Sequence, residues 1–180
     1  MDLKKPLIIN NVLPEQINYH LLKCASTKNY GFGYEGTGVC QLDSCIDPTL
    51  PHMGMSYHVS DDKTEMKDFL DDFLKLYTYH ISCTVIEKLK IDKFSIYRSV
   101  WNYYYKDQEG IGHIDHSEDN YISLVYTPLT TDGGTEILGQ VYPDIARQVK
   151  VFKSNWMHKG ICVKEKKARF SLNIILKLYG

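Results

Sequence analysis

The sequence lacks an excess of charge of either sign and lacks long apolar runs. Its 180 residues include 21 basic and 22 acidic side chains, which give a net charge of -1 with seven histidines counted as neutral. The chain as a whole therefore lacks the positive field that holds a phosphate backbone, which argues against tight nonspecific nucleic-acid binding. No stretch approaches the length of a membrane-spanning helix, and residues 1–6 do not have the pattern of a signal peptide.

The cysteines also lack the patterns that build covalent or metal frameworks. They are odd in number and contain no Cys-x-x-Cys pair, so neither a disulfide framework nor a cysteine-rich zinc site is expected. We interpret them as reduced thiols in an intracellular, cytoplasmic protein. The five residues are Cys24, Cys40, Cys45, Cys83 and Cys162.

The first half of the chain has the periodicity of helices. A short strand is expected at residues 7–9, and Pro14 then precedes apolar residues that are spaced as in a helix. A longer helical pattern covers residues 62–89, as one helix or as two that meet near Tyr79. Between these helices, residues 30–51 are rich in glycine and turn residues, which indicates a long loop or a pair of short strands.

The second half of the chain has the character of a β-sheet, because aromatic and β-branched residues gather in short segments between turns. The predicted strands cover residues 94–105, 121–127, 135–138, 149–152 and 168–178. Helices followed by strands predict an α+β fold with the helices packed outside a sheet-rich core. We expect one domain over residues 1–180, with helical support and substrate loops in 1–93 and a metal-binding β core in 94–178.

A candidate metal site lies in the second half. His113 and Asp115 are two residues apart, so their side chains share one face if the segment is extended. Together with the distant His158 they form the ligand set of non-haem Fe(II) oxygenases, which leaves positions open for a co-substrate and O₂. A three-ligand zinc site would use similar residues. His113 with His116 could also chelate a metal in a helix or turn.

The last predicted strand carries a cation on its inward face. Arg169, Ser171 and Asn173 alternate with apolar residues, so they point away from the helices. An unpaired arginine there would have a severe desolvation cost, and a dicarboxylate is its expected partner; an internal Arg–Asp or Arg–Glu pair is the alternative. Upstream, Asn102 and Tyr104 share a face and could hydrogen-bond a 2-oxo acid, or simply line a strand.

Five segments together resemble the 2-oxoglutarate- and Fe(II)-dependent oxygenase superfamily. The resemblance covers residues 94–178 and is strongest to the prolyl-hydroxylase-like branch, in its small bacterial and phage versions. The segments are Asn102-Tyr103-Tyr104, Gly112-His113-Ile114-Asp115, Asp132-Gly133-Gly134-Thr135-Glu136, His158-Lys159-Gly160 and Arg169-Phe170-Ser171.

The resemblance implies a double-stranded β-helix, which is a jelly-roll core of the cupin kind. Three catalytic iron ligands are implied, namely His113, Asp115 and His158. The resemblance also implies that Arg169, assisted by Ser171, binds the distal carboxylate of 2-oxoglutarate, and it places Tyr104 against the same co-substrate.

The implied reaction is oxidative decarboxylation of 2-oxoglutarate to succinate and CO₂, coupled to hydroxylation of a substrate. It would use Fe(II) and O₂, with ascorbate as a supporting reductant. Because residue 115 is an aspartate rather than the glycine or alanine of halogenating relatives, hydroxylation is favoured over halogenation. Ile175 stands where nucleic-acid dealkylases carry a second arginine, which weakens a role in DNA or RNA repair.

The expected substrate is a peptidyl residue, proline most naturally, or a free amino acid or other small molecule. An oxygenase acting on a nucleobase or modified nucleotide and a non-catalytic metal-binding barrel are the alternatives. No membrane partner is expected, and the sequence leaves the oligomeric state open.

Substrate contacts are expected from two loops at the barrel mouth, residues 30–58 and 106–110. The candidate side chains in the first loop are Phe32, Tyr34, Glu35, His52 and Tyr57. Glu136 and Trp156 are further candidates near the motif segments.

Overall fold

The computed structural model describes residues 3–26, 31–32, 53–58, 72–107, 110–166 and 168–179. The helices are α1 (Glu15–Ser26) and α2 (Asp72–Leu89). The strands are β1 (Leu7–Ile9), β2 (Gly31–Phe32), β3 (Met53–His58), β4 (Lys93–Tyr105), β5 (Tyr121–Thr127), β6 (Gly134–Ile137), β7 (Gln140–Pro143), β8 (Gln148–Lys153), β9 (His158–Ile161) and β10 (Ala168–Tyr179).

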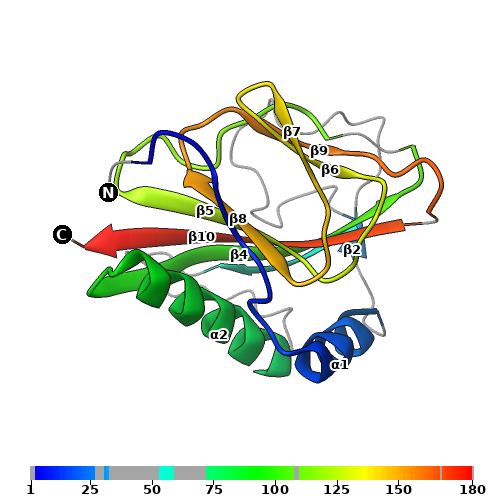
Figure 1. The fold of residues 1–180 in the computed structure, drawn as a ribbon, viewed down its shortest axis with the longest axis horizontal. Coiled ribbons are helices and arrows are strands. Elements are labelled where there is room, and N and C mark those ends of the chain that lie inside the picture. The colour runs from blue at the N-terminus through cyan, green and yellow to red at the C-terminus, as the bar shows by residue number, and fades with distance from the viewer. Residues whose placement is uncertain are drawn as a thin grey trace.

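The strands form two antiparallel sheets with both helices on one side (Figure 1). The larger sheet has the order β1-β8-β5-β10-β4-β3-β2, and the smaller has the order β7-β6-β9. The smaller sheet covers the face of the larger sheet that is opposite the helices (Figure 1). This arrangement confirms the predicted α+β class with a jelly-roll core and helices packed on the outside.

The apolar face of β10 determines which of its side chains point inward. Leu172, Ile174 and Leu176 are buried in one cluster with Ile81 and Val85 of α2. Burial of each such side chain contributes about 1.5–3 kcal/mol, so this face stays against the helices. The polar residues that alternate with it therefore point toward the smaller sheet, as the sequence predicts.

A β-bulge changes the alternation of β4. Two consecutive residues of β10 pair with Ile96 and Arg98, so Tyr97 is the extra residue. Ile96 before the bulge packs on the helix-side cluster, and Trp101 after the bulge belongs to the same cluster. The bulge therefore turns Arg98 and the even-numbered residues that follow it toward the smaller sheet.

The helices confirm the prediction in part. α1 follows Pro14 as expected, and α2 continues without a break through Tyr79. The beginning of the predicted long helix, residues 62–71, lies outside the described residues. Among the described residues, no helix combines the length and the apolar character needed to cross a membrane.

Two short strands of the smaller sheet, β7 and β9, were absent from the prediction. β6 and β7 are joined by Leu138 and Gly139, which have φ angles of 52° and 80°. Positive φ at both positions of a two-residue loop gives the tight hairpin turn that matches strand twist. Of the glycine-rich region, residues 30–51, the structure describes only Gly31 and Phe32, which form β2 and pair with β3 just beyond the region. The rest of this expectation lies outside the described residues.

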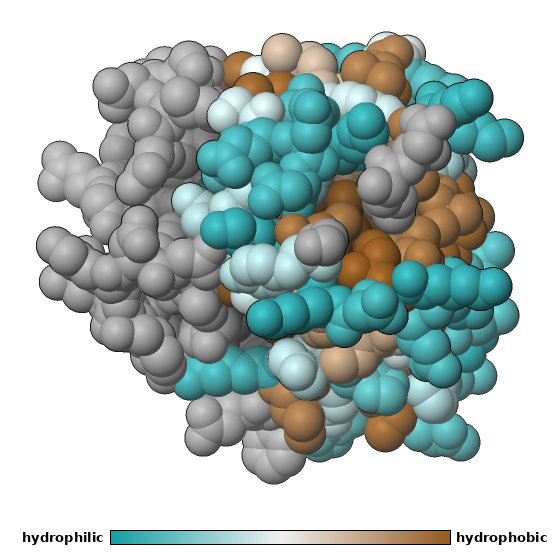
Figure 2. Space-filling model, turned by 90° about the vertical axis from the view of Figure 1, so that its left-hand side faces the viewer, coloured by the Kyte–Doolittle hydropathy of each residue, from teal (hydrophilic) through white to brown (hydrophobic). Residues whose placement is uncertain are grey.

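The described surface carries exposed apolar side chains on several elements. Figure 2 views the end of the molecule where both chain termini lie and shows a hydrophobic area bordered by hydrophilic side chains. The most exposed large apolar side chains of the described residues include Tyr19, Leu76, Tyr79, Leu138 and Met157. They come from α1, α2, the β6–β7 turn and the connection before β9, and scattered exposure of this kind is normal for a protein surface.

Candidate metal centre

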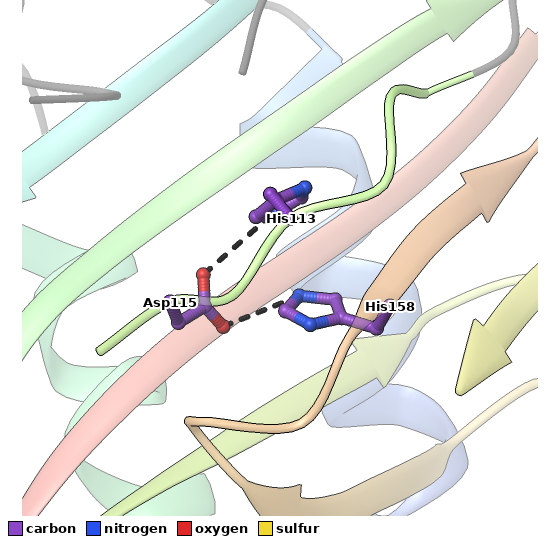
Figure 3. A group of neighbouring side chains, drawn as sticks. All are labelled: His113, Asp115 and His158. Atoms are coloured by element: carbon purple, nitrogen blue, oxygen red, sulfur yellow. Dashed lines mark ion pairs between the residues drawn. The ribbon is translucent and has the colours of Figure 1, made fainter. Parts of the chain in front are cut away.

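The three predicted metal ligands converge in the structure (Figure 3). His113 and Asp115 lie in the connection between β4 and β5, and His158 is the first residue of β9. His113 and His158 exchange two backbone hydrogen bonds of 2.9 Å, and the Asp115 N–H donates to the Ser154 carbonyl at 2.9 Å. These bonds hold two segments that are distant in the sequence side by side.

The ligand atoms of these residues face one another. Nε2 of His113 is 3.7 Å from Oδ1 of Asp115, and Nε2 of His158 is 3.4 Å from Oδ2. One ligand atom from each residue lies within 4.8 Å of the others. The two Nδ1 atoms contact backbone carbonyls, of Ile111 at 2.8 Å and of Trp156 at 3.0 Å. Because a carbonyl only accepts, each Nδ1 carries the proton and each Nε2 presents its lone pair to the centre.

The electrostatics of the site keep His113 neutral and Asp115 ionised, as a metal requires, but they favour a proton on His158 that a metal would displace. Burial and the neighbouring His158 lower the pKa of His113, which keeps that ring neutral. Burial opposes ionisation of Asp115, but His158 and Arg98 outweigh it and hold the pKa of the carboxyl far below its usual value. Burial also opposes protonation of His158, yet attraction to Asp115 raises its pKa. A divalent cation among these atoms would take over the role of balancing Asp115.

Neighbouring polar side chains orient Asp115 through both of its oxygens. Nη2 of Arg98 donates to Oδ1 at 3.1 Å, and the Ser123 hydroxyl donates to Oδ2 at 2.6 Å. Nδ2 of Asn173 donates to the two oxygens at 3.2 and 3.3 Å. Oδ1 of Asn173 is buried and finds no hydrogen-bond donor among the described residues. Partners of this kind fix the direction of a metal ligand, so the residues present fit a divalent metal.

His116 does not join this group. Its ring stacks on Tyr121 with the ring centroids 3.6 Å apart, and its Nδ1 accepts the backbone N–H of Glu118 at 3.2 Å. Within the described residues, the structure therefore supports Asp115 over His116 as the partner of His113. The segment is not a regular strand, because only one isolated bridge involves His113, but the expected directions of the side chains hold. Two histidines and one carboxylate suit both Fe(II) and Zn(II).

Arg169 already has a carboxylate partner inside the protein. Its Nε donates to Asp144 Oδ2 at 2.6 Å, and its Nη2 donates to Asp144 Oδ1 at 3.3 Å and to Thr135 Oγ1 at 3.1 Å. Nζ of Lys150 donates to Asp144 Oδ1 at 3.1 Å. The argument that a buried Arg169 needs a dicarboxylate ligand for want of an internal partner is therefore wrong. The alternative, an internal Arg–Asp pair, is what the structure contains.

The other edge of the Arg169 guanidinium faces β9 and β4. A Cβ atom added to Gly160 would lie 3.0 Å from Nη1, and the Tyr104 ring centroid lies 5.5 Å from Cζ. Gly160 follows His158 by two residues on β9, which is about 7 Å along a strand. Nη1 of Arg169 therefore approaches β9 on the face that also carries His158.

The remaining predicted co-substrate residues lie on the same interior faces. Ser171 is buried, and it lies between Arg169 and Asn173 on the inward face of β10. Asn102 pairs with Ser171 across the β4–β10 ladder, and Tyr104 pairs with Arg169. The structure brings these side chains together on facing positions of two neighbouring strands.

The predicted substrate residues are less completely described. Glu136 on β6 is partly buried, and its carboxylate lies 3.9 Å from Nζ of Lys159. Trp156 packs against a small cluster that contains Phe152. Phe32 and Tyr57 lie on β2 and β3, whose side chains are not described, and Tyr34, Glu35 and His52 lie outside the described residues. In the second loop, residues 106, 107 and 110 are described.

Sequence reasoning missed the residues that support the ligands. Arg98 was missed because strict alternation from Ile96 would have placed it on the other face of β4 if the bulge were absent. Asp144 follows Pro143 and has the appearance of a turn residue. Lys150 did carry a signal, because it interrupts the apolar run of a predicted buried strand.

No family model matches the chain, and no curated protein matches it. Solved structures do match. An oxidoreductase of the 2OG-Fe(II) oxygenase family from Burkholderia pseudomallei is 12% identical over 97% of this chain and 86% of its own, with a TM-score of 0.70. The viral collagen prolyl hydroxylase of Paramecium bursaria Chlorella virus 1, solved with 2OG, is 13% identical over 98% of this chain and 97% of its own, with a TM-score of 0.59.

A third match has a different activity. The epimerase SnoN, solved with Fe³⁺, alpha ketoglutarate and nogalamycin RO, is 8% identical over 96% of this chain and 78% of its own, with a TM-score of 0.66. At these identities the comparisons establish the fold, and they confirm the predicted double-stranded β-helix of the 2-oxoglutarate oxygenases. A shared fold leaves the reaction and the substrate to be argued from the site.

Proposed function

We propose that this protein is a 2-oxoglutarate- and Fe(II)-dependent dioxygenase that hydroxylates a substrate C–H bond. The observation that carries this proposal is the ligand set: the Nδ1 bonds of two histidines turn both Nε2 atoms toward one buried carboxylate. The balanced reaction is R–H + O₂ + 2-oxoglutarate → R–OH + succinate + CO₂. Bound Fe(II) would supply the activation of O₂.

The chain's own residues would hold and orient the reactants. His113, Asp115 and His158 would bind the metal from one side, which leaves the opposite side for the co-substrate and O₂. Nη1 of Arg169 and the Tyr104 hydroxyl would bind the distal carboxylate of 2-oxoglutarate, with Asn102 and Ser171 lining the space between the two ends. The buried position of the site would exclude water from the reacting centre.

We further propose a peptidyl residue, prolyl in the first instance, or a free amino acid as substrate. The match to the viral prolyl hydroxylase covers nearly the full length of both chains, whereas 22% of the epimerase, the complement of the 78% covered, has no counterpart here. The near-zero net charge weighs against a nucleic-acid substrate. Cys83 and Cys162 are free, which supports a reducing, cytoplasmic location.

Succinate formation tests this proposal. Purified protein would be incubated with Fe(II), ascorbate and 2-oxoglutarate in the presence of proline peptides, free amino acids or oligonucleotides. We expect iron-dependent succinate formation that rises with proline peptides or a free amino acid. His113→Ala should abolish turnover while the protein stays folded. The matched control is His80→Ala, because His80 is an exposed histidine on α2.

The outcomes separate the alternatives. Stimulation by oligonucleotides alone would move the substrate class to nucleobases. Turnover that is equal in wild type and His113→Ala would overturn the assignment of the ligand set. Failure of the wild-type protein to bind both a divalent metal and 2-oxoglutarate would leave a barrel without this activity.

A further inference from the structure

The buried charge cluster beside β10 holds two cations and one carboxylate. The side chains of Lys150, Asp144 and Arg169 are 0%, 1% and 2% exposed. Within the described part of the chain, neither cation has a second carboxylate within 4.0 Å. The cluster therefore has a net charge of +1 in a place where an unbalanced charge is costly.

Asp144 occupies one edge of the Arg169 guanidinium and leaves the other edge free. Nε and Nη2 donate to Asp144 and Thr135. No acceptor for Nη1 is found among the described residues, and this atom faces Gly160. Asp144 thus holds the guanidinium so that Nη1 points toward Gly160 of β9 and the Tyr104 ring of β4.

The same carboxylate would also weaken Arg169 as an anion receptor. An isolated Arg169–Asp144 pair is neutral, and its negative member would repel a second carboxylate that approached the free edge. Lys150 changes this balance, because its ammonium lies 3.1 Å from Oδ1 of Asp144. The two cations together hold the pKa of Asp144 below its usual value even though burial opposes ionisation.

We propose that Lys150 is a positioning residue for the co-substrate: it neutralises Asp144, so that the charge of Arg169 stays available to the distal carboxylate of 2-oxoglutarate. This inference rests on the proposed function and deepens it. Asp144 sets the direction of the guanidinium, and Lys150 offsets the negative charge of Asp144. A bound distal carboxylate would then make the cluster neutral. The protein would thereby select a dicarboxylic 2-oxo acid over a monocarboxylic one.

A purely structural role for Lys150 makes a different prediction. If Lys150 served only to pair Asp144, its removal would lower stability and would weaken all 2-oxo acids alike. The proposed role instead makes the loss depend on the charge at the far end of the ligand. Ligand discrimination therefore separates the two roles.

The test is a calorimetric titration of the Mn(II)-loaded, full-length protein with two ligands. One ligand is 2-oxoglutarate, and the other is 2-oxo-5-methylhexanoate, in which an uncharged isopropyl group replaces the distal carboxylate. The variants are Lys150→Met and the double variant Lys150→Met/Asp144→Asn. Lys153→Met is the matched control, because it makes the same change on the same strand. Thermal unfolding confirms that each variant is folded.

We expect Lys150→Met to lose at least about tenfold in affinity for 2-oxoglutarate, or about 1.4 kcal/mol, with the affinity for the uncharged ligand unchanged. The double variant should regain at least about threefold of the loss in affinity, or about 0.6 kcal/mol, because its cluster has a charge of +1 again. Lys153→Met should bind both ligands as the wild type does. If Lys150→Met proves unfolded, the double variant alone tests the proposal. Its binding of 2-oxoglutarate with the affinity of the wild type would then support the proposal.

Three results would overturn the inference: unchanged 2-oxoglutarate binding by Lys150→Met, an equal loss for both ligands, or no recovery in the double variant. Failure of the proposed function is recognised separately. In that case the wild-type protein itself would not bind 2-oxoglutarate in the presence of Mn(II).

Discussion

The barrel interior contains two charged clusters of opposite composition. The metal end consists of His113, Asp115 and His158, and the far end consists of Asp144, Lys150 and Arg169. At the metal end, one carboxylate is surrounded by two histidines, a guanidinium and neutral donors, and its site gains from an added cation. At the far end, two cations share one carboxylate, and the site gains from an added anion. The two ends would thus suit the metal ion and the dicarboxylate of the proposed function. Arg98 and Lys150, which would touch neither ligand, contribute to the net charge of each end.

The largest effect should come from removing the carboxylate of the far end. Asp144→Ala leaves the buried Lys150 and Arg169 without their partner, which costs about 3–5 kcal/mol of the free energy of unfolding. His113→Ala in the metal-free protein should change it by less than about 1 kcal/mol, since His113 is partly exposed. Urea unfolding measures both, with Asp92→Ala as the control at an exposed carboxylate. Equal losses at the two ends would contradict the comparison.

At the metal end, substitutions should reduce the affinity for a divalent metal ion. Arg98→Gln removes the guanidinium that donates to Asp115, and changes to such supporting residues reduce metal affinity by about 10–100-fold. Titration with Mn(II) measures the affinity. We expect Ser123→Ala to have the smaller effect, because Arg98 and Asn173 still hold Asp115. If the Arg98→Gln protein binds Mn(II) with wild-type affinity, Arg98 does not support the metal site.

A substitution at Gly160 should change the affinity for 2-oxoglutarate and leave the affinity for Mn(II) as it is. The added Cβ of Gly160→Ala would lie 3.0 Å from Nη1 of Arg169, so the guanidinium must move from its position beside β9. We expect a loss of about threefold to tenfold in 2-oxoglutarate affinity, or about 0.6–1.4 kcal/mol, with Mn(II) affinity unchanged. Gly139→Ala is unsuitable as a control, because its φ of 80° would add strain. A parallel loss of metal binding would show that Gly160 supports His158 instead.

The smallest effect should come from Asp132, whose ionisation affects the stability of the protein in acid. Asp132 accepts the backbone N–H groups of Lys164 and Glu165 at 2.7 Å, and these bonds lower its pKa from 3.8 to about 2. Because the folded pKa is the lower one, this stabilisation is complete above about pH 4 and is lost as the pH falls toward 2. Asp132→Asn should flatten that part of the stability profile of the metal-free protein. An unchanged profile in pH-dependent thermal melts would count against this role.

The sequence predicted the parts of this protein that depend on local pattern. Strand alternation correctly placed Arg169 and Ser171 on the inward face of β10, and the His113–Asp115 spacing correctly predicted that these two side chains point to one place. The residue range of the single domain and the substrate loops stay predictions.

The missed features depend on register and on long-range pairing. Arg98 reaches Asp115 only because one extra residue in β4 reverses the alternation, and a bulge leaves little trace in a single sequence. Asp144 meets Arg169 across 25 positions of sequence. Neither contact follows from the spacing of residues along one strand, so the internal partner of Arg169 could be named only as an alternative.

A crystal structure of the protein with Mn(II) and 2-oxoglutarate would show both proposed binding sites at once. We expect anomalous density for Mn(II) between His113, Asp115 and His158, with the distal carboxylate of 2-oxoglutarate on Nη1 of Arg169 and the Asp144–Lys150 contact kept. A metal bound elsewhere, or a distal carboxylate that displaces Asp144 or lies away from Arg169, would contradict the proposed function.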